Sequence, residues 1–261
     1  MPTVAVNGET LHYVRQGSGP AVVFVHYLGG YSRSWQRQID ALKDRFTCIA
    51  FDQRGYGFST LNGRWSVAAS AEDLKAGLDA LGIEQAHFVG YSMGGPVLLT
   101  FNARWPERVR SLMLIDTFAR NDRHAAGRIA ESEKCLRYMS MRQYGRQYAA
   151  ARLMPDVPEP VVNELVASIR LARKEAYLDS VRGILGPDFS GLCPLVKAPT
   201  LVVCGRLDVT TPVEQTSDLT RLIRGAREKI IEAAHLGIWE NPDAFDEVVI
   251  GFLDEQEGRR P

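Results

Sequence analysis

Short apolar runs alternate with helical patterns along most of this chain, and this alternation limits the fold more than any other feature. We expect strands at residues 21–26, 46–51, 86–90, 109–115, 200–204 and 228–231. Helical patterns fall near residues 34–43, 67–81, 95–104, 213–222 and 243–254. Strands that are joined through helices run parallel, with right-handed crossovers. The alternation therefore predicts an α/β protein with a mostly parallel, doubly wound sheet.

An antiparallel hairpin is expected before the alternation begins. Residues 3–6 and 10–16 flank Asn7-Gly8. This dipeptide is the strongest short hairpin signal, because both of its residues tolerate the positive φ that the turn requires. Together with the six strands above, the hairpin makes the predicted sheet eight-stranded.

The alternation stops between Phe118 and about Gly191. Only helical stretches are expected there, near residues 121–137, 140–152, 160–170 and 173–184. We therefore predict a core made of residues 1–118 and 191–261, with a helical insertion at residues 119–190.

Composition excludes several classes of protein. Lys+Arg and Asp+Glu both number 31, so the formal net charge is zero and nothing points to nucleic acid. No apolar run approaches the roughly 20 residues that span a bilayer, and the first residues lack the pattern of a signal peptide. Four widely spaced cysteines suit a reducing compartment. We expect a cytoplasmic protein without membrane or nucleic-acid partners, and we leave a homodimer open.

A serine between two glycines follows the expected strand 86–90. The sequence Gly90-Tyr91-Ser92-Met93-Gly94 has a strand before it and a helix after it. So tight a turn strains the serine backbone and leaves no room for side chains at the flanking positions. The strain exposes the Ser92 hydroxyl, and the N–H of Met93 points at the group that it attacks. The pattern predicts Ser92 as a nucleophile.

A serine hydroxyl needs a general base, and the base needs an acid to orient it. Of the five histidines, His235 lies in a loop beyond the last expected strand, whereas the others lie in strands, in the hairpin or in a helix. Asp208 follows strand 200–204 and gives the chain order Ser, Asp, His. Asp116, at the end of strand 109–115, is the alternative acid. We predict Asp208 and His235 as the partners of Ser92.

Five motifs in this order resemble the α/β-hydrolase family over nearly the whole chain. They are VVFVHYLGG at 22–30, DQRGYGFS at 52–59, the turn at Ser92, the loop at Asp208, and the His235 loop ending in Glu240-Asn241-Pro242. The resemblance implies that the insertion is a cap over the site. It also implies that Leu28 and Met93 supply the N–H groups of an oxyanion hole.

One position departs from the family pattern. Family members usually carry His-Gly at the start of the oxyanion loop, whereas this chain has His26-Tyr27. The ring of Tyr27 either packs beneath the loop or lines the pocket and bonds a substrate oxygen.

Substrate contacts are expected from a few large side chains. The aromatic candidates are Tyr27, Trp35, Tyr138 and Trp239, with core packing as the alternative for each. The first half of the insertion is basic, so one or two of its guanidinium groups either hold a substrate carboxylate or face solvent.

The resemblance implies two-step acyl transfer on a small ester or lactone, as in 3-oxoadipate enol-lactonase-like hydrolases and small carboxylesterases. No cofactor and no metal are expected. Two alternatives stay open: a carbon–carbon bond hydrolase for β-diketones that uses the same three residues, and a catalytically slow ligand receptor on the same fold.

Overall fold

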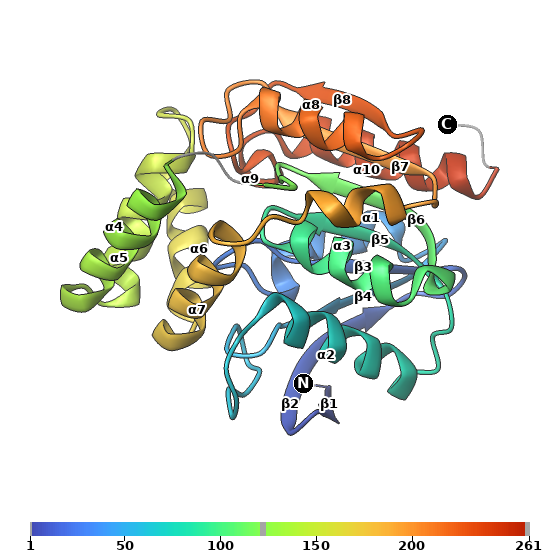
Figure 1. Ribbon diagram of the computed structural model, residues 1–261, viewed down its shortest axis with the longest axis horizontal. Coiled ribbons are helices and arrows are strands. Elements are labelled where there is room, and N and C mark those ends of the chain that lie inside the picture. The colour runs from blue at the N-terminus through green and yellow to red at the C-terminus, as the bar shows by residue number, and fades with distance from the viewer. Residues whose placement is uncertain (1, 121–123, 259–261) are drawn as a thin grey trace.

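The computed structural model describes residues 2–120 and 124–258, and its centre is an eight-stranded sheet (Figure 1). The strand order is β1-β2-β4-β3-β5-β6-β7-β8. The strands are β1 Thr3–Val6, β2 Glu9–Gln16, β3 Ala21–Val25, β4 Thr47–Phe51, β5 Ala86–Tyr91, β6 Val109–Ile115, β7 Thr200–Gly205 and β8 Arg227–Ile231. The predicted mostly parallel sheet is confirmed, because β4, β3, β5, β6, β7 and β8 are joined by parallel pairing.

The hairpin forms as predicted, with Thr3 opposite His12 and Val6 opposite Glu9. Asn7 and Gly8 both have positive φ, at 50° and 80°. Strand β2 then pairs antiparallel with β4 and so attaches the hairpin to the parallel sheet.

Two layers of helices cover the sheet (Figure 1). The layer on one face holds α2 Val67–Ala80, α3 Gly94–Arg104 and α8 Val213–Leu222, and the other holds α1 Gln36–Leu42 and α10 Pro242–Gln256. Every residue of β3, β4, β5 and β7 is buried. Burial on both faces explains why these strands are continuous apolar runs rather than alternating ones.

The predicted boundaries hold to within about two residues for the long elements. The sequence did not predict the four-residue helix α9 Gly237–Glu240 or the 3-10 turns Ser32–Trp35, Pro106–Arg108 and Ser190–Leu195. Such short elements carry too few turns to produce a periodic signal. The helix expected from residue 121 begins at Ala125, and residues 121–123 lie outside the described part of the chain.

Four helices between β6 and β7 stand together beyond one end of the sheet, at the left of Figure 1. They are α4 Ala125–Tyr138, α5 Met141–Arg152, α6 Glu159–Arg170 and α7 Lys174–Leu185. Ser168 Oγ of α6 donates to the carbonyl of Gly29 at 2.7 Å, and the N–H of Arg173 donates to the carbonyl of Gly55 at 2.8 Å. These bonds tie the inserted helices to the loops that follow β3 and β4.

Candidate active site

Ser92 lies at the strained turn between β5 and α3. Its φ is 48°, in the left-handed region that non-glycine residues rarely adopt. A Cβ on Gly90 would approach Leu98 Cδ1 to 2.6 Å, and one on Gly94 would approach the Val25 carbonyl oxygen to 2.5 Å. The two glycines therefore let α3 pack closely on β5 and β3, which holds the turn in its strained form.

Ser92, His235 and Asp208 come together from three distant parts of the chain. Ser92 Oγ lies 3.1 Å from His235 Nε2, and His235 Nδ1 lies 2.7 Å from Asp208 Oδ2. All three side chains are buried. This arrangement can move the serine proton to the imidazole while the carboxylate orients the ring.

The Asp208 carboxylate is fixed by its own loop. Oδ1 accepts the N–H groups of Thr210 and Thr211 at 2.7 and 3.0 Å, and Oδ2 accepts the Thr211 hydroxyl at 2.6 Å. Burial alone would raise the pKa of Asp208, but the interaction with His235 and the Thr211 bonds outweigh burial and lower it. Asp208 is therefore held as a carboxylate facing the imidazole.

Asp116, the alternative acid, faces elsewhere. Its Oδ1 accepts the N–H of Gly205 at 2.7 Å, and its Oδ2 lies 2.6 Å from the Tyr91 hydroxyl, which lies 3.0 Å from the carbonyl of His235. Burial, followed by the charge of Asp208, raises the pKa of Asp116 well above its ordinary value. The carboxyl group of Asp116 therefore bonds the strand end and the Tyr91 hydroxyl, whereas that of Asp208 bonds the His235 ring.

Leu28 lies in a tight turn at the edge of the site. The N–H of Gly30 donates to the carbonyl of Tyr27 at 2.9 Å, and Gly29 has a φ of 87°. Among the described residues, neither the Leu28 N–H nor the Met93 N–H donates to a protein acceptor. Both groups are thus available to a substrate oxygen.

The His26 side chain links this turn to Gln53 through two hydrogen bonds. Its Nε2 accepts the N–H of Gln53 at 3.1 Å, so the ring proton resides on Nδ1 and is donated to the carbonyl of Tyr27 at 2.9 Å. Burial lowers the pKa of His26 to about 4. The ring is therefore neutral near pH 7, as this pair of bonds requires.

A cavity of about 50 Å³ connects Ser92 with the inserted helices. Leu28, Ser92, Phe118, Thr210, Thr211 and His235 line it from the core, and Arg128, Ser132, Tyr144, Tyr148, Arg152, Val181, Ile184 and Leu185 line it from α4, α5 and α7. A second cavity, of about 190 Å³, lies between α4 and α5 and shares Arg128 and Arg152 with the first. Two guanidinium groups thus border the space in front of the serine.

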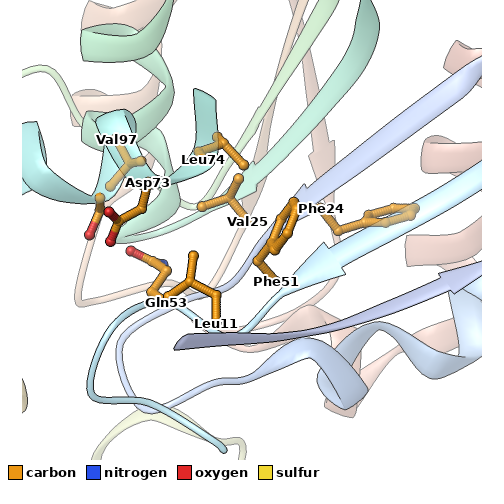
Figure 2. A pocket seen from close by; sticks show the side chains of 9 residues that line it. Leu11, Phe24, Val25, Phe51, Gln53, Asp73, Leu74 and Val97 are labelled. Carbon is orange, nitrogen blue, oxygen red and sulfur yellow. The ribbon is translucent and has the colours of Figure 1, made fainter. Parts of the chain in front are cut away.

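A third cavity is unsuited to a substrate (Figure 2). It lies between the sheet and helices α2 and α3, and its wall includes Leu11, Phe24, Phe51, Gln53 and Asp73. None of Ser92, His235 and Asp208 lines it. Its volume of about 20 Å³ suits one water molecule. Gln53 Oε1 and Ser70 Oγ, both on its wall, have no hydrogen-bond partner among the described residues.

The structure corrects two of the expected substrate contacts. Trp35 is fully buried between Phe24, Tyr91 and Phe245, and is thus a core residue. Tyr138 is 79% exposed at the end of α4 and lines no part of the cavity. An aromatic side chain at helical spacing does not reveal which face of its helix is covered.

Tyr27 and Trp239 lie beneath the site rather than in its wall. Tyr27 is fully buried, and its hydroxyl accepts the Trp239 Nε1–H at 2.8 Å. Neither side chain lines the cavity in front of Ser92. The alternative in which Tyr27 packs under the loop is the one that the structure contains.

Several lining residues were not singled out from sequence. Phe118, Val181, Ile184 and Leu185 are apolar and face the cavity from the end of β6 and from α7. The spacing of the last three fits one face of a helix, but such a stripe is equally consistent with a packed core.

Within residues 2–120 and 124–258, no helix is long and apolar enough to cross a bilayer. The same residues contain no cluster of three or more His, Cys, Asp or Glu side chains arranged for a metal ion.

Comparison with known proteins agrees with this architecture. A family model described as the alpha/beta hydrolase fold matches residues 20–242. The chain is similar to 3-oxoadipate enol-lactonase 2 of Acinetobacter baylyi, with 29% identity over 260 residues that cover 95% of this chain and 94% of that protein.

Two solved structures extend the likeness. The enol-lactonase from Burkholderia xenovorans LB400 has a TM-score of 0.90 and 28% identity, covering 97% of this chain and 99% of that one. A thermophilic esterase from Thermogutta terrifontis, in its malate-bound form, has a TM-score of 0.86 and 28% identity, covering 97% of each chain. Since the family model spans most of the sequence and the sheet carries the expected strand–turn–helix at Ser92, this chain belongs to the α/β-hydrolase fold family.

Proposed function

We propose that this protein is a serine hydrolase that cleaves a small ester or lactone carrying a carboxylate, through an acyl-enzyme. The observation that carries the proposal is the hydrogen-bonded series Ser92, His235, Asp208, of which Ser92 and His235 line the cavity below the inserted helices. The similarity to enol-lactonases and to an esterase supports ester and lactone bonds as the target.

In the first half-reaction His235 Nε2 takes the hydroxyl proton of Ser92, and Oγ attacks the substrate carbonyl carbon. The carbonyl oxygen becomes an oxyanion, which accepts the N–H groups of Leu28 and Met93. Asp208 stabilises the imidazolium through Nδ1. When the oxyanion reforms a carbonyl, the bond to the alkoxy oxygen breaks, and the imidazolium gives its proton to that oxygen.

In the second half-reaction His235 removes a proton from water, and the water oxygen attacks the acyl carbon. The same two N–H groups hold the new oxyanion. Its collapse breaks the bond to Ser92 Oγ, which regains its proton from His235. The carboxylic acid leaves, and the enzyme returns to its starting state.

Arg128 and Arg152 are the groups that we assign to a substrate carboxylate. Arg152 stacks its guanidinium over the Tyr148 ring at 4.0 Å, and no carboxylate of the described residues pairs with it. Arg128 Nη1 donates to the carbonyl of Thr210 at 3.1 Å, beside the Asp208 loop. Guanidinium groups at a half-buried wall suit a carboxylate, and malate, bound by one structural relative, is itself a dicarboxylate.

The four helices between β6 and β7 act as a lid in this proposal. With α4, α5, α6 and α7 closed over Ser92, bulk water is kept from the acyl-enzyme and each hydrogen bond gains strength. The cavity shared by α4 and α5 provides the route by which substrate enters.

A fluorophosphonate probe tests the activation of Ser92 without knowledge of the substrate. We expect mass spectrometry to find the adduct on the Ser92 peptide, and we expect Ser92→Ala to be unlabelled and to lose about 10⁶-fold in turnover of p-nitrophenyl butyrate. Absence of labelling and of turnover in the wild type would overturn the proposal. Tight reversible ligand binding without turnover would then favour a receptor. Cleavage of a β-diketone without cleavage of esters would favour a carbon–carbon bond hydrolase.

Paired esters test the carboxylate. For Arg152→Gln we expect KM to rise at least tenfold with p-nitrophenyl hemisuccinate and to stay within threefold with p-nitrophenyl butyrate. Arg142→Gln is the matched control, because Arg142 is an exposed arginine on the same helix. Equal changes in KM for the two esters would remove Arg152 from this role.

A further inference from the structure

A side-chain hydrogen bond between Trp239 and Tyr27 joins the oxyanion loop to the loop that carries His235. We propose that Tyr27 and Trp239 form a brace that positions the Leu28 N–H relative to Ser92 and His235. This inference rests on the proposed function, and it assigns a role to the position where the chain departs from the His-Gly pattern of its family.

The phenol of Tyr27 is fully buried, yet its polar atom is satisfied. It accepts the Trp239 Nε1–H at 2.8 Å and lies 3.4 Å from Ser34 Oγ. Burial raises the pKa of Tyr27 to about 12, so the hydroxyl remains neutral and can accept and donate at once. A buried phenol or indole N–H without a partner would destabilise the fold. Phenylalanine would fill the same space, so packing alone does not account for the hydroxyl.

Tyr27 is placed to act on the oxyanion donor directly. Leu28 is the next residue, and the Tyr27 carbonyl closes the turn by accepting from Gly30 at 2.9 Å. The same carbonyl accepts from His26 Nδ1 at 2.9 Å. With ring and carbonyl both held, the peptide that carries the Leu28 N–H has little freedom to rotate.

The other end of the brace is fixed to the histidine loop. Trp239 lies in α9, four residues after His235, and its backbone N–H donates to the carbonyl of Leu236 at 2.8 Å. Next to it, Glu240 Oε2 accepts the N–H of Ala234 at 2.5 Å, and Oε1 accepts that of Met154 at 3.1 Å. Helix α9 thus connects the oxyanion loop, the backbone on both sides of His235 and the loop after α5.

The nucleophile is coupled to the same ring. Tyr27 packs edge-on against Tyr91 with 5.7 Å between ring centroids. Tyr91 precedes Ser92 directly, and its hydroxyl lies 3.0 Å from the carbonyl of His235. Tyr27 and Trp239 touch no wall of the cavity, so they act through other residues as positioning residues.

The test is a double-mutant cycle on p-nitrophenyl butyrate. We expect Tyr27→Phe and Trp239→Phe each to lower kcat about tenfold with KM within threefold, since loss of a whole oxyanion donor costs about 10²–10³. Because both changes remove one shared hydrogen bond, the double variant should resemble either single variant rather than show a hundredfold loss. The inhibition constant of butylboronic acid, which forms a tetrahedral adduct with the serine, should rise in parallel with the fall in kcat.

Tyr13→Phe and Trp105→Phe are the matched controls, because these residues lie in β2 and just after α3. A purely structural role predicts a lower unfolding midpoint in urea with unchanged kcat. If Tyr27→Phe folds and keeps more than half of the wild-type kcat, or if the losses of the singles multiply, the brace is refuted while the hydrolase remains. A wild type without turnover would overturn both proposals.

Discussion

The neutral state of His26 leads to a quantitative expectation about stability in acid. In the folded protein His26 Nε2 accepts the Gln53 N–H and Nδ1 donates to the Tyr27 carbonyl. A second proton on the ring removes the acceptor and places a charge in a fully buried site. Burial is the cause that lowers the pKa from 6.5 to about 4.

The sign follows from linkage. The unfolded chain takes up the proton near pH 6.5, whereas the folded chain resists it until about pH 4. The contribution of His26 to the free energy of unfolding is therefore fully present above pH 6.5. It is lost as the pH falls from 6.5 to about 4. At ~1.4 kcal/mol for each pH unit, the whole loss is about 3 kcal/mol, of which about 2 kcal/mol is lost by pH 5.

The perturbation that isolates this effect is His26→Asn. Asparagine can still donate toward the Tyr27 carbonyl, but it does not titrate, and the Gln53 N–H loses its acceptor at a cost of about 1–3 kcal/mol. We expect the variant to be less stable than the wild type at pH 7.5 and the difference to shrink by about 2 kcal/mol at pH 5.

Urea unfolding followed by tryptophan fluorescence at pH 7.5, 6 and 5 measures both proteins. Parallel pH profiles for the wild type and His26→Asn would refute the reasoning, because they would mean that His26 takes up its proton equally in both states.

The remaining expectations concern the two carboxyl groups and the turn. Asp208→Asn should lower kcat about 10⁴-fold. Asp116→Asn should keep kcat within tenfold, since Asp116 bonds Gly205 and Tyr91 rather than the His235 ring; equal losses in the nitrophenyl ester assay would contradict this assignment. Gly95→Ala should destabilise by about 1–3 kcal/mol in urea unfolding, because its Cβ would lie 2.1 Å from Thr117 Oγ1. Adding Thr117→Ser should leave that loss in place, because the serine retains Oγ, so full recovery would point to the methyl group as the source of the clash.

Much of the fold could be predicted because its signals are local. A strand covered on both faces is mostly apolar, and β3, β4, β5 and β7 are largely apolar runs in the sequence. The hairpin at Asn7-Gly8 depends on two residues that accept positive φ. Short elements such as α9 escaped prediction because four residues make barely one turn.

The three polar residues of the candidate site could also be named from sequence. Each follows a strand at the same edge of a parallel sheet, so chain order and turn pattern select Ser92 and His235 and favour Asp208 as the acid. The choice between Asp208 and Asp116 could not be settled in this way, because both end neighbouring strands. Their different partners, His235 for one and Tyr91 for the other, depend on how the loops fold back.

Periodicity, turn residues and motif order are properties of neighbours in the chain, and they sufficed for the class of fold and for the polar residues at the strand ends. The choice of aromatic and basic side chains that face the serine is different, because it depends on how segments such as α4, α5 and α7 pack against the rest of the molecule. Trp35 lies in the core, Tyr138 is exposed to solvent, and Arg152 lines the cavity, although each has a side chain that could contact a substrate. Burial of one helix face against distant segments makes that selection, and no local pattern specifies the distant partner.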